Sequence, residues 1–176
     1  MKVIGIDPGI TATGYGILSL FARGHRSEET SVKELKGICC GTIRPKRGEI
    51  YSKISEICEN IKHLIDKNKP DLAVLEKIFY QKNIQSLLRS SELRGAIILT
   101  LINSKIKIIE YTPAQIKLTT TGNGRASKKQ VRYFIERIVM KNNKRASCHA
   151  IDALAIAYTA VHKLQFQKNK FYNRIV

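Results

Sequence analysis

The sequence predicts an α/β protein built on one mixed, five-stranded sheet flanked by helices. Three apolar segments joined by short connections come first, at residues 2–7, 15–20 and 38–44, and strands joined in this way pair antiparallel. Two further apolar runs, at residues 72–75 and 106–109, are separated by helical patterns, which favours parallel strands.

Helical spacing of apolar residues predicts five helices between and after the strands. Pro113 suits the first turn of a helix at residues 112–121, because the backbone N–H that proline lacks has no partner in a first turn. Ser127 has the side chain of an N-cap and precedes a helix that runs to Met140. The remaining helices are expected at residues 48–68, 81–102 and 149–163.

The chain length fits a single domain, since 176 residues are close to the usual size of one. We expect this domain to span residues 1–165 and to be followed by a flexible C-terminal tail at residues 166–176. The polar segment at residues 21–36 is expected to be a hairpin loop.

Cysteine usage and hydropathy indicate a cytoplasmic protein. The four cysteines, two of them adjacent at Cys39 and Cys40, form no CxxC pair, so neither a zinc site nor a disulfide framework is expected. Reduced thiols are the default in the cytoplasm. The N-terminus lacks the pattern of a signal peptide, and no apolar run is long enough to span a membrane.

Positive charge dominates the sequence and is concentrated in its second half. The net charge is +17, of which residues 104–176 carry +12 from 15 basic residues and three acids. Such an excess indicates a polyanionic partner, and nucleic acid is the commonest one. A charge that serves only solubility, or binding to an anionic membrane surface, is the alternative.

Three carboxylates stand in apolar surroundings, where a charged group is costly unless it is paired or binds a cation. Asp7 follows the apolar run VIGI, Glu76 follows LAVL, and Asp152 lies within AIDALAIA. Asp7 and Glu76 end strands that are predicted to be parallel, and open α/β sheets place their sites at this edge. His149 precedes Asp152 by three residues, so the two share one helix face.

These side chains are the ligand types of a divalent-metal site. Carboxylate oxygens suit Mg²⁺ and Mn²⁺, and two such ions about 3.5–4 Å apart can stabilise both the attacking and the leaving oxygen of a phosphodiester. The alternative is that each acid only ends a strand or stabilises a helix start, for which the helix dipole would suffice at Asp152. Three acids in matched settings within a strongly basic protein favour a metal-dependent enzyme.

Two glycine-containing segments resemble phosphate-binding loops. Residues 9–14 have P-loop spacing, but Tyr15 stands where lysine is required. Residues 122–124 open onto a basic helix start, which suits contacts to a DNA backbone. The basic side chains there are Arg125, Lys128, Lys129 and Arg132, and a solvated charged helix is the alternative.

Aromatic residues follow the second candidate carboxylate. Phe79 and Tyr80 lie just beyond Glu76 and are followed by Lys82. Aromatic side chains beside a metal site and a cation can stack on exposed bases. Phe79 is therefore a candidate DNA contact, and packing in the core is the alternative.

Five blocks of the sequence resemble the RuvC family of bacterial Holliday-junction resolvases. They are IGIDPGITATGYGIL, LAVLEKIFYQKN, LRGAI, YTPAQIKLTTTGNGRASKKQV and HAIDALAIA. The blocks occur in the family's order and cover most of residues 2–163, and it is their combination that is specific.

The resemblance implies an RNase H-like fold and an endonuclease that resolves four-way DNA junctions by paired, symmetric nicks in recombination and repair. It also implies a homodimer with two divalent ions in each active site, Mg²⁺ in the first place, with Mn²⁺ also supporting activity. Asp7, Glu76 and Asp152 match the family's catalytic, metal-binding carboxylates. His149 stands at the fourth position, where many relatives have aspartate and some have histidine.

Further residues acquire roles from the same resemblance. Lys117 and Lys128 match basic positions linked to catalysis or DNA contact, and Phe79 matches an aromatic residue beside the junction centre. The helix at residues 81–102 matches the dimer-forming helix, and the family works with a branch-migration motor complex. The resemblance assigns no role to residues 21–36 or to the C-terminal tail.

Two other functions remain open from the sequence. A junction-binding scaffold with an inactive site would keep the basic charge but would not need the complete acidic set. An ATP-using enzyme of the actin-like superfamily would also have Asp-x-Gly after its first strand. Such enzymes need two domains of this kind around the nucleotide, and 176 residues hold only one.

Overall fold

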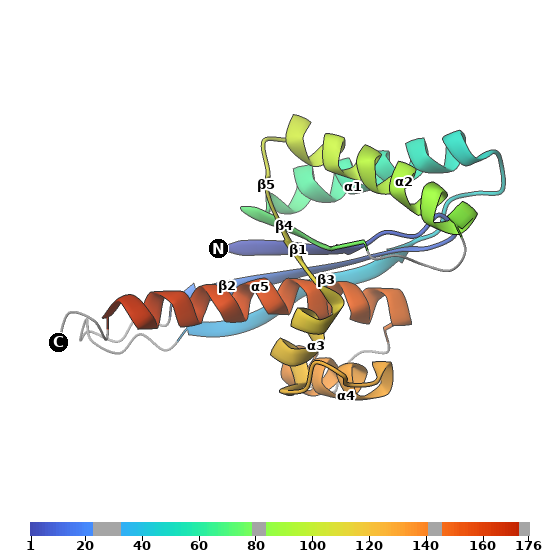
Figure 1. Cartoon of the computed structure of the whole chain (residues 1–176). Helices are drawn as coiled ribbons and strands as arrows, with labels where there is room; N and C mark the ends of the chain where they lie inside the picture. Colours follow the sequence, from blue (N-terminus) through green and yellow to red (C-terminus); the bar gives the residue numbers. More distant parts are fainter. Residues whose placement is uncertain (23–32, 79–83, 141–145, 173–176) are drawn as a thin grey trace.

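The computed structural model describes residues 1–22, 33–78, 84–140 and 146–172, and these form one mixed sheet with helices on both faces (Figure 1). The strands are β1 (Lys2–Asp7), β2 (Thr13–Ala22), β3 (Lys33–Ile43), β4 (Leu72–Glu76) and β5 (Lys107–Tyr111). They lie in the order β3-β2-β1-β4-β5, with β1–β2 and β2–β3 antiparallel and β1–β4 and β4–β5 parallel. The predicted mixed, five-stranded sheet is confirmed, including which strands are parallel.

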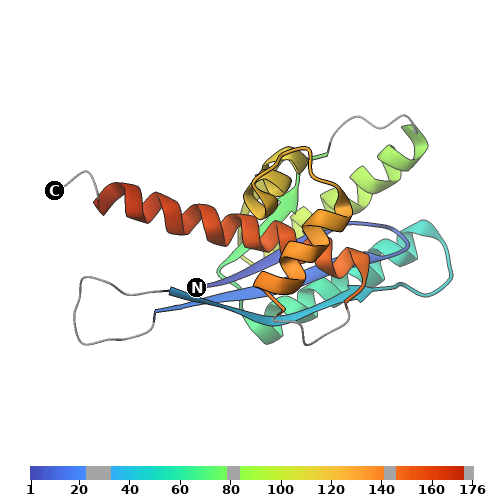
Figure 2. The same cartoon turned by 90° about the horizontal axis from the view of Figure 1, so that it is seen from below.

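Helices cover both faces of the sheet (Figure 1). On one face α1 (Ile50–Asn68) packs beside α2 (Ile84–Asn103), and α5 (Cys148–Tyr172) runs along the other. Figure 2 shows α3 (Pro113–Thr121) and α4 (Lys128–Ile138) beside the first half of α5. Both short helices begin as predicted. Thr112 Oγ1 accepts a hydrogen bond from Gln115 N at 3.1 Å, and Ser127 Oγ accepts one from Gln130 N at 3.3 Å.

The strands divide the buried side chains between the two faces, because successive residues of a strand point to opposite sides. Ile4 of β1 and Leu75 of β4 belong to the apolar cluster under α1 and α2. Val3 and Val74, one position away on the same strands, belong to the cluster under α5. All four are fully buried, so the alternation decides which side chains can face α5.

Glycines let α5 lie directly on β1 and β2. A Cβ atom at Gly5 would come within 2.2 Å of Ala153 O, and one at Gly14 within 2.0 Å of His149 O. Any larger residue at these positions would push the helix away from the sheet, since close-packed interiors have no free space for an added carbon. The glycines therefore place the first two turns of α5 against the end of β1.

The loop predicted at residues 21–36 is wrong at both ends. β2 continues to Ala22 and β3 begins at Lys33, and these two residues pair with each other. β3 is at the edge of the sheet, where charged side chains are tolerated, so its first residues lack the apolar pattern on which the prediction relied. Residues 23–32 lie outside the described part of the chain.

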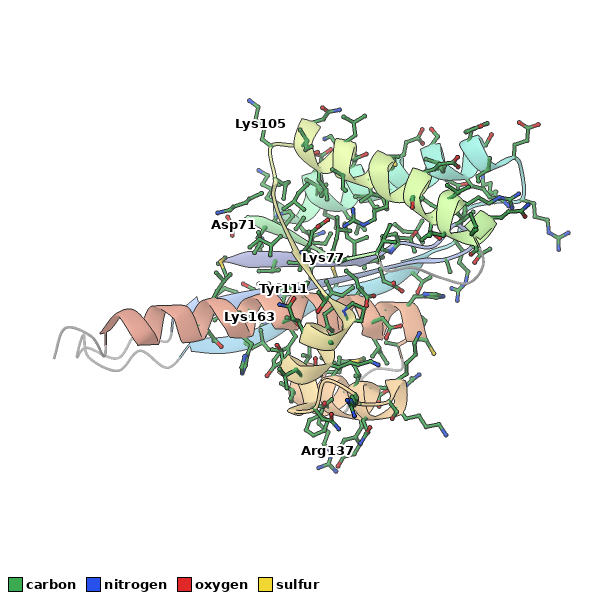
Figure 3. All side chains as sticks on the ribbon, viewed as in Figure 1. Asp71, Lys77, Lys105, Tyr111, Arg137 and Lys163 are labelled. Atoms are coloured by element: carbon green, nitrogen blue, oxygen red, sulfur yellow. The ribbon has the colours of Figure 1, made fainter. Side chains whose placement is uncertain are left out.

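The helix predicted at residues 149–163 is longer than expected, since α5 continues to Tyr172. Beyond its midpoint, Lys163 Nζ lies 4.6 Å from the centre of the Tyr111 ring at the end of β5 (Figure 3). The domain boundary at residue 165 stays a prediction, and residues 173–176 are not among those described. Within the described ranges, no helix is both long and apolar enough to cross a membrane.

Candidate active site

Two carboxylates end neighbouring parallel strands at one edge of the sheet. Asp7 is the last residue of β1 and Glu76 the last of β4, and the parallel pairing of the two strands brings them side by side. Both point toward the face that α5 covers, because they continue the alternation of Val3 and Val74. The predicted position of both acids at the carboxyl ends of parallel strands is confirmed.

The first turn of α5 is held against the same edge by its cap. Ser147 Oγ accepts a hydrogen bond from Ala150 N at 3.1 Å and also bonds to the hydroxyl of Thr42 on β3. The cap determines where the helix begins, and with it the positions of His149 and Asp152.

His149 contacts Asp7 directly, with Nδ1 3.0 Å from Asp7 Oδ2. The turn that follows Asp7 is closed by Thr13, whose side chain is fully buried. Gly9 N donates to Thr13 Oγ1 at 3.2 Å, and Thr13 Oγ1 donates to Gly9 O at 2.9 Å. The Asp7 carboxylate is thus positioned by a hydrogen-bonded turn on one side and by the imidazole of α5 on the other.

Burial and mutual repulsion raise the pKa of both strand-end carboxyls. For Asp7, burial raises the pKa most, the hydrogen bond with His149 opposes this rise, and the charge of Asp152 adds to it. For Glu76, burial again raises the pKa most, followed by the charges of Asp7 and Asp152. The three carboxylates therefore share one patch, in which a positive ion would be stabilised.

Two lysines reach this patch from α3 and α4. Lys128 opposes the rise in pKa at Asp7 and at Glu76, and Lys117 does so at Glu76. Lys128 Nζ lies 3.6 Å from Asp152 Oδ2, but 87% of its side chain is exposed, so this ion pair contributes little to stability. Both lysine charges therefore act on the same carboxylate patch.

The donor set suits a hard divalent cation, since three carboxylates and an imidazole gather at one edge of the sheet. Among the described residues, however, no three His, Cys, Asp or Glu side chains stand close enough together to hold a metal ion. An ion would have to bring the carboxylates closer than they stand here. Their raised pKa values indicate that binding would relieve a repulsion, so the residues fit the ion in chemistry.

Glu76→Gln is expected to stabilise the fold at neutral pH, although it removes a candidate metal ligand. Folding raises the pKa of Glu76, so the folded state holds this proton to higher pH than the unfolded state does. Stability therefore falls as pH rises from the unfolded pKa to the folded pKa. The increase in stability from Glu76→Gln should be complete at a pH above this window and absent below it. Each kcal/mol of added stability should raise the Tm by about 2–4 °C. Thermal melts of wild type and Glu76→Gln in a chelator, at a series of pH values, measure this difference. A Tm of Glu76→Gln that is equal to or below that of wild type at neutral pH would contradict the repulsion between Glu76 and the other carboxylates.

The fold and the carboxylate patch have counterparts among known proteins. The sequence model of the family described as Crossover junction endodeoxyribonuclease RuvC matches residues 3–160 of this chain. The chain belongs to the RuvC family. RuvC from Syntrophomonas wolfei is 36% identical over 163 residues, which make up 92% of this chain and 89% of the relative.

Solved RuvC structures have the same fold. A Thermus thermophilus RuvC structure matches with a TM-score of 0.81 at 21% identity, covering 95% of this chain and 97% of the other. The T. thermophilus RuvC in complex with a Holliday junction substrate matches with a TM-score of 0.78 at 19% identity, covering 94% and 96%. The predicted RNase H-like fold is confirmed, and membership of the RuvC family makes the protein a metal-dependent nuclease.

Basic side chains surround the RuvC carboxylates on the side of α3 and α4. Arg125, Lys128 and Lys129 are exposed at the start of α4, and Lys117 is partly buried on α3. The structure brings Lys117 and Lys128 to the carboxylates, while Arg125 and Lys129 flank Lys128 in the sequence. Phe79 falls outside the described residues, so its placement stays a prediction.

Arg132 differs from these cations because its guanidinium contacts other residues of the same chain. Its Nε donates to Glu136 Oε1 at 2.8 Å, its Nη2 donates to Ala146 O at 3.1 Å, and its Nη1 lies 3.6 Å from Cys148 Sγ. These contacts join α4 to the start of α5, one residue before His149. The i,i+4 spacing of Arg132 and Glu136 is a signal for the first contact, but no sequence pattern indicates the second, because its partner at Ala146 is a backbone carbonyl.

Arg132→Ala is therefore expected to lower the nicking rate at saturating DNA by about tenfold or more, because small displacements of catalytic groups are costly. Metal-free DNA binding should keep its salt dependence. Arg137→Ala is the matched control, since it removes an exposed arginine of the same helix whose guanidinium lies over Tyr133. Its nicking rate should stay near wild type. If Arg132→Ala instead shows a weaker salt dependence of DNA binding and an unchanged nicking rate, Arg132 contacts DNA, as the sequence predicted.

Proposed function

We propose that this chain resolves four-way DNA junctions by metal-dependent hydrolysis of paired phosphodiesters. The observation that carries the proposal is the patch formed by Asp7, Glu76 and Asp152, which β1, β4 and α5 bring to one edge of the sheet. A family member of the same fold, T. thermophilus RuvC, has been solved in complex with a Holliday junction substrate. The basic surface around the patch supports DNA as the substrate.

We assign the metal to Asp7, Glu76, Asp152 and His149, with two Mg²⁺ ions in each site and Mn²⁺ as a substitute. Bound there, the ions would supply an activated water and stabilise the charge on the leaving 3′ oxygen. The chain itself orients the carboxylates, through the Asp7–His149 contact and the capped start of α5. Lys117 lies near enough to Glu76 to affect its pKa, and we assign it to the negative charge that develops on the phosphate.

The exposed cations beside the site are assigned to the DNA backbone. Arg125, Lys128 and Lys129 stand at the start of α4 with their charges in solvent. Such side chains hold a nucleic acid in register without reading its sequence. Phe79 is assigned to stacking at the open centre of the junction, on the family resemblance and on its place in the sequence after Glu76.

A homodimer formed through α2 suits a substrate with two-fold symmetry. The side of α2 opposite its buried residues carries the large apolar side chains Ile84, Leu88, Leu99 and Ile102, each between 57% and 59% exposed. Gly95 lies between them on the same side, with open space around it. An exposed apolar stripe of this kind marks an interaction site, and a second α2 packed antiparallel would cover it.

A further partner and a location are proposed from the family resemblance. The junction DNA of bacteria lies in the cytoplasm, so we place the protein there. A branch-migration motor complex is the partner expected to bring the enzyme and the junction together.

A synthetic four-way junction and a linear duplex of the same sequence, each incubated with and without Mg²⁺, test the proposed function. We expect symmetric nicks in the junction only, and only with the divalent ion. Tight binding without cutting under any divalent ion would favour the inactive scaffold instead. Nucleotide hydrolysis by the pure protein would favour the ATP-using enzyme.

His149→Asp is expected to reduce the difference between Mn²⁺ and Mg²⁺ as activating ions. A neutral imidazole brings no charge to the site, and Mg²⁺ binds most strongly to oxygen ligands, whereas Mn²⁺ accepts imidazole more readily. Wild-type enzyme should therefore reach half-maximal nicking at a lower concentration of Mn²⁺ than of Mg²⁺. Titration of both ions against both proteins measures this. The same ratio for wild type and variant would remove His149 from the ligand set.

A further inference from the structure

A second group of cations lies at the catalytic edge, next to β3, two strands away from Asp7. It belongs to the connection between β3 and α1, where Arg44, Lys46 and Arg47 are all exposed. No ion pair to any of these three side chains occurs among the described residues. The one acid of this connection, Glu49, is also exposed, so residues 44–49 carry a net charge of +2.

The register of the sheet places this connection beside the carboxylates. Asp7 pairs with Gly14, and Gly14 pairs with Thr42 near the end of β3. Two strand spacings separate Asp7 from Thr42, or about 10 Å. Figure 1 shows the β3–α1 connection at the same end of the molecule as the first turn of α5.

The last residues of β3 show which side of the sheet this connection leaves. The Thr42 hydroxyl bonds to Ser147 at the start of α5, so Thr42 faces α5, and Ile43 packs in the cluster under α1 and α2. Arg44 directly follows Ile43, the last residue of β3, and Thr42 two positions earlier is on the α5 side, which is the side of Asp7 and Glu76.

The backbone of the connection is held in place. Lys46 N donates to Glu56 Oε2 of α1 at 2.9 Å, and Ile43 before it is buried. A loop whose backbone is already ordered loses little conformational entropy when its side chains bind a ligand.

We propose that Arg44 and Arg47 form a phosphate-binding site for the DNA strand on the β3 side of the catalytic carboxylates. The inference rests on the proposed function. A patch of carboxylates repels a DNA backbone, and Lys117 and Lys128 offset this repulsion next to Glu76 and Asp152. The β3–α1 connection supplies matching charge on the β3 side, so the strand that is cut would be held on both sides of the scissile bond.

Binding to the four-way junction in a chelator, measured across a series of NaCl concentrations, tests this site without cutting. Arg44→Ala should weaken binding and flatten the log–log salt slope by about 0.9 for a lost duplex contact, and the Arg44→Ala/Arg47→Ala double variant by about twice that. Lys128→Ala serves as the comparison next to Asp152. Lys107→Ala, an exposed cation that begins β5 at the opposite edge of the sheet, should change the slope little. Thermal melts establish that each variant is folded.

Junctions with a single neutral methylphosphonate near the cut locate the contact. At the phosphate that Arg44 binds, the neutral group should weaken binding by wild type but not by Arg44→Ala. The proposal fails if Arg44→Ala and the double variant keep the wild-type slope while Lys128→Ala flattens it, or if Lys107→Ala has an equal effect. Because these are binding measurements, they are separate from the nicking assay that decides the proposed function.

Discussion

Asp7→Asn is expected to reduce junction nicking by about 10²–10³-fold or more, while junction affinity without metal stays within a few-fold of wild type. Asparagine keeps the size of the side chain and an oxygen that can face His149, but it removes the charge that a divalent ion requires. Asp7 is partly buried between the turn closed by Thr13 and the start of α5, so the substitution removes a carboxylate that the fold positions at the end of β1.

Rates measured at saturating junction, together with affinities measured in a chelator, separate these two effects. Asp71→Asn is the matched control, because Asp71 is an exposed aspartate just before β4, at the end of the strand away from Glu76 (Figure 3), and asparagine keeps an oxygen that can accept from Lys2 N. It should cut like wild type. An Asp7→Asn protein that nicks at near wild-type rate with Mg²⁺ alone would remove Asp7 from the metal site.

Gly14→Ala is expected to damage both stability and cutting, although Gly14 carries no chemistry. Its new Cβ would lie 2.0 Å from His149 O and 2.4 Å from His149 C, both backbone atoms that cannot rotate away. The start of α5 must then move off β2, and His149 and Asp152 move with it. Overpacking of this kind costs about 1–3 kcal/mol, and the displacement of catalytic groups should lower the nicking rate by up to about a hundredfold.

Thermal melting and nicking rates measure the two consequences. Gly48→Ala is the control for the thermal melts, since a Cβ at Gly48 meets nothing within 4 Å. Normal cutting by Gly14→Ala at a temperature where it is fully folded would mean that the close approach of α5 does not determine the site.

The parts of the fold that the sequence predicted are those with a regular pattern. Apolar runs predicted five strands and which of them are parallel, and therefore the edge where Asp7 and Glu76 meet. The helix spacing of His149 and Asp152 placed them on one face, and the sheet brings that face to Asp7. These features are local in sequence, so local periodicity was enough.

Other features depend on contacts between distant segments and left no pattern to find. The pairing of Ala22 with Lys33 at the edge of the sheet extends a hairpin in which charged residues of β3 interrupt the apolar pattern. Arg132 stands among cations predicted to face DNA, but the fold brings the Ala146 carbonyl to it. The exposed Arg44 connection was not singled out either, because only the register of β3 shows that it lies beside the carboxylates.

The most direct test of the account is the cutting of a supercoiled plasmid that extrudes a four-way junction, with wild type and Asp7→Asn compared in Mg²⁺ and in a chelator. With Mg²⁺, wild type should convert the plasmid to linear DNA through two symmetric nicks at the junction. Asp7→Asn in Mg²⁺, and wild type in the chelator, should leave it uncut. Cutting that persists in the chelator, or that occurs equally in plasmid without the junction, would contradict a metal-dependent resolvase built on these carboxylates.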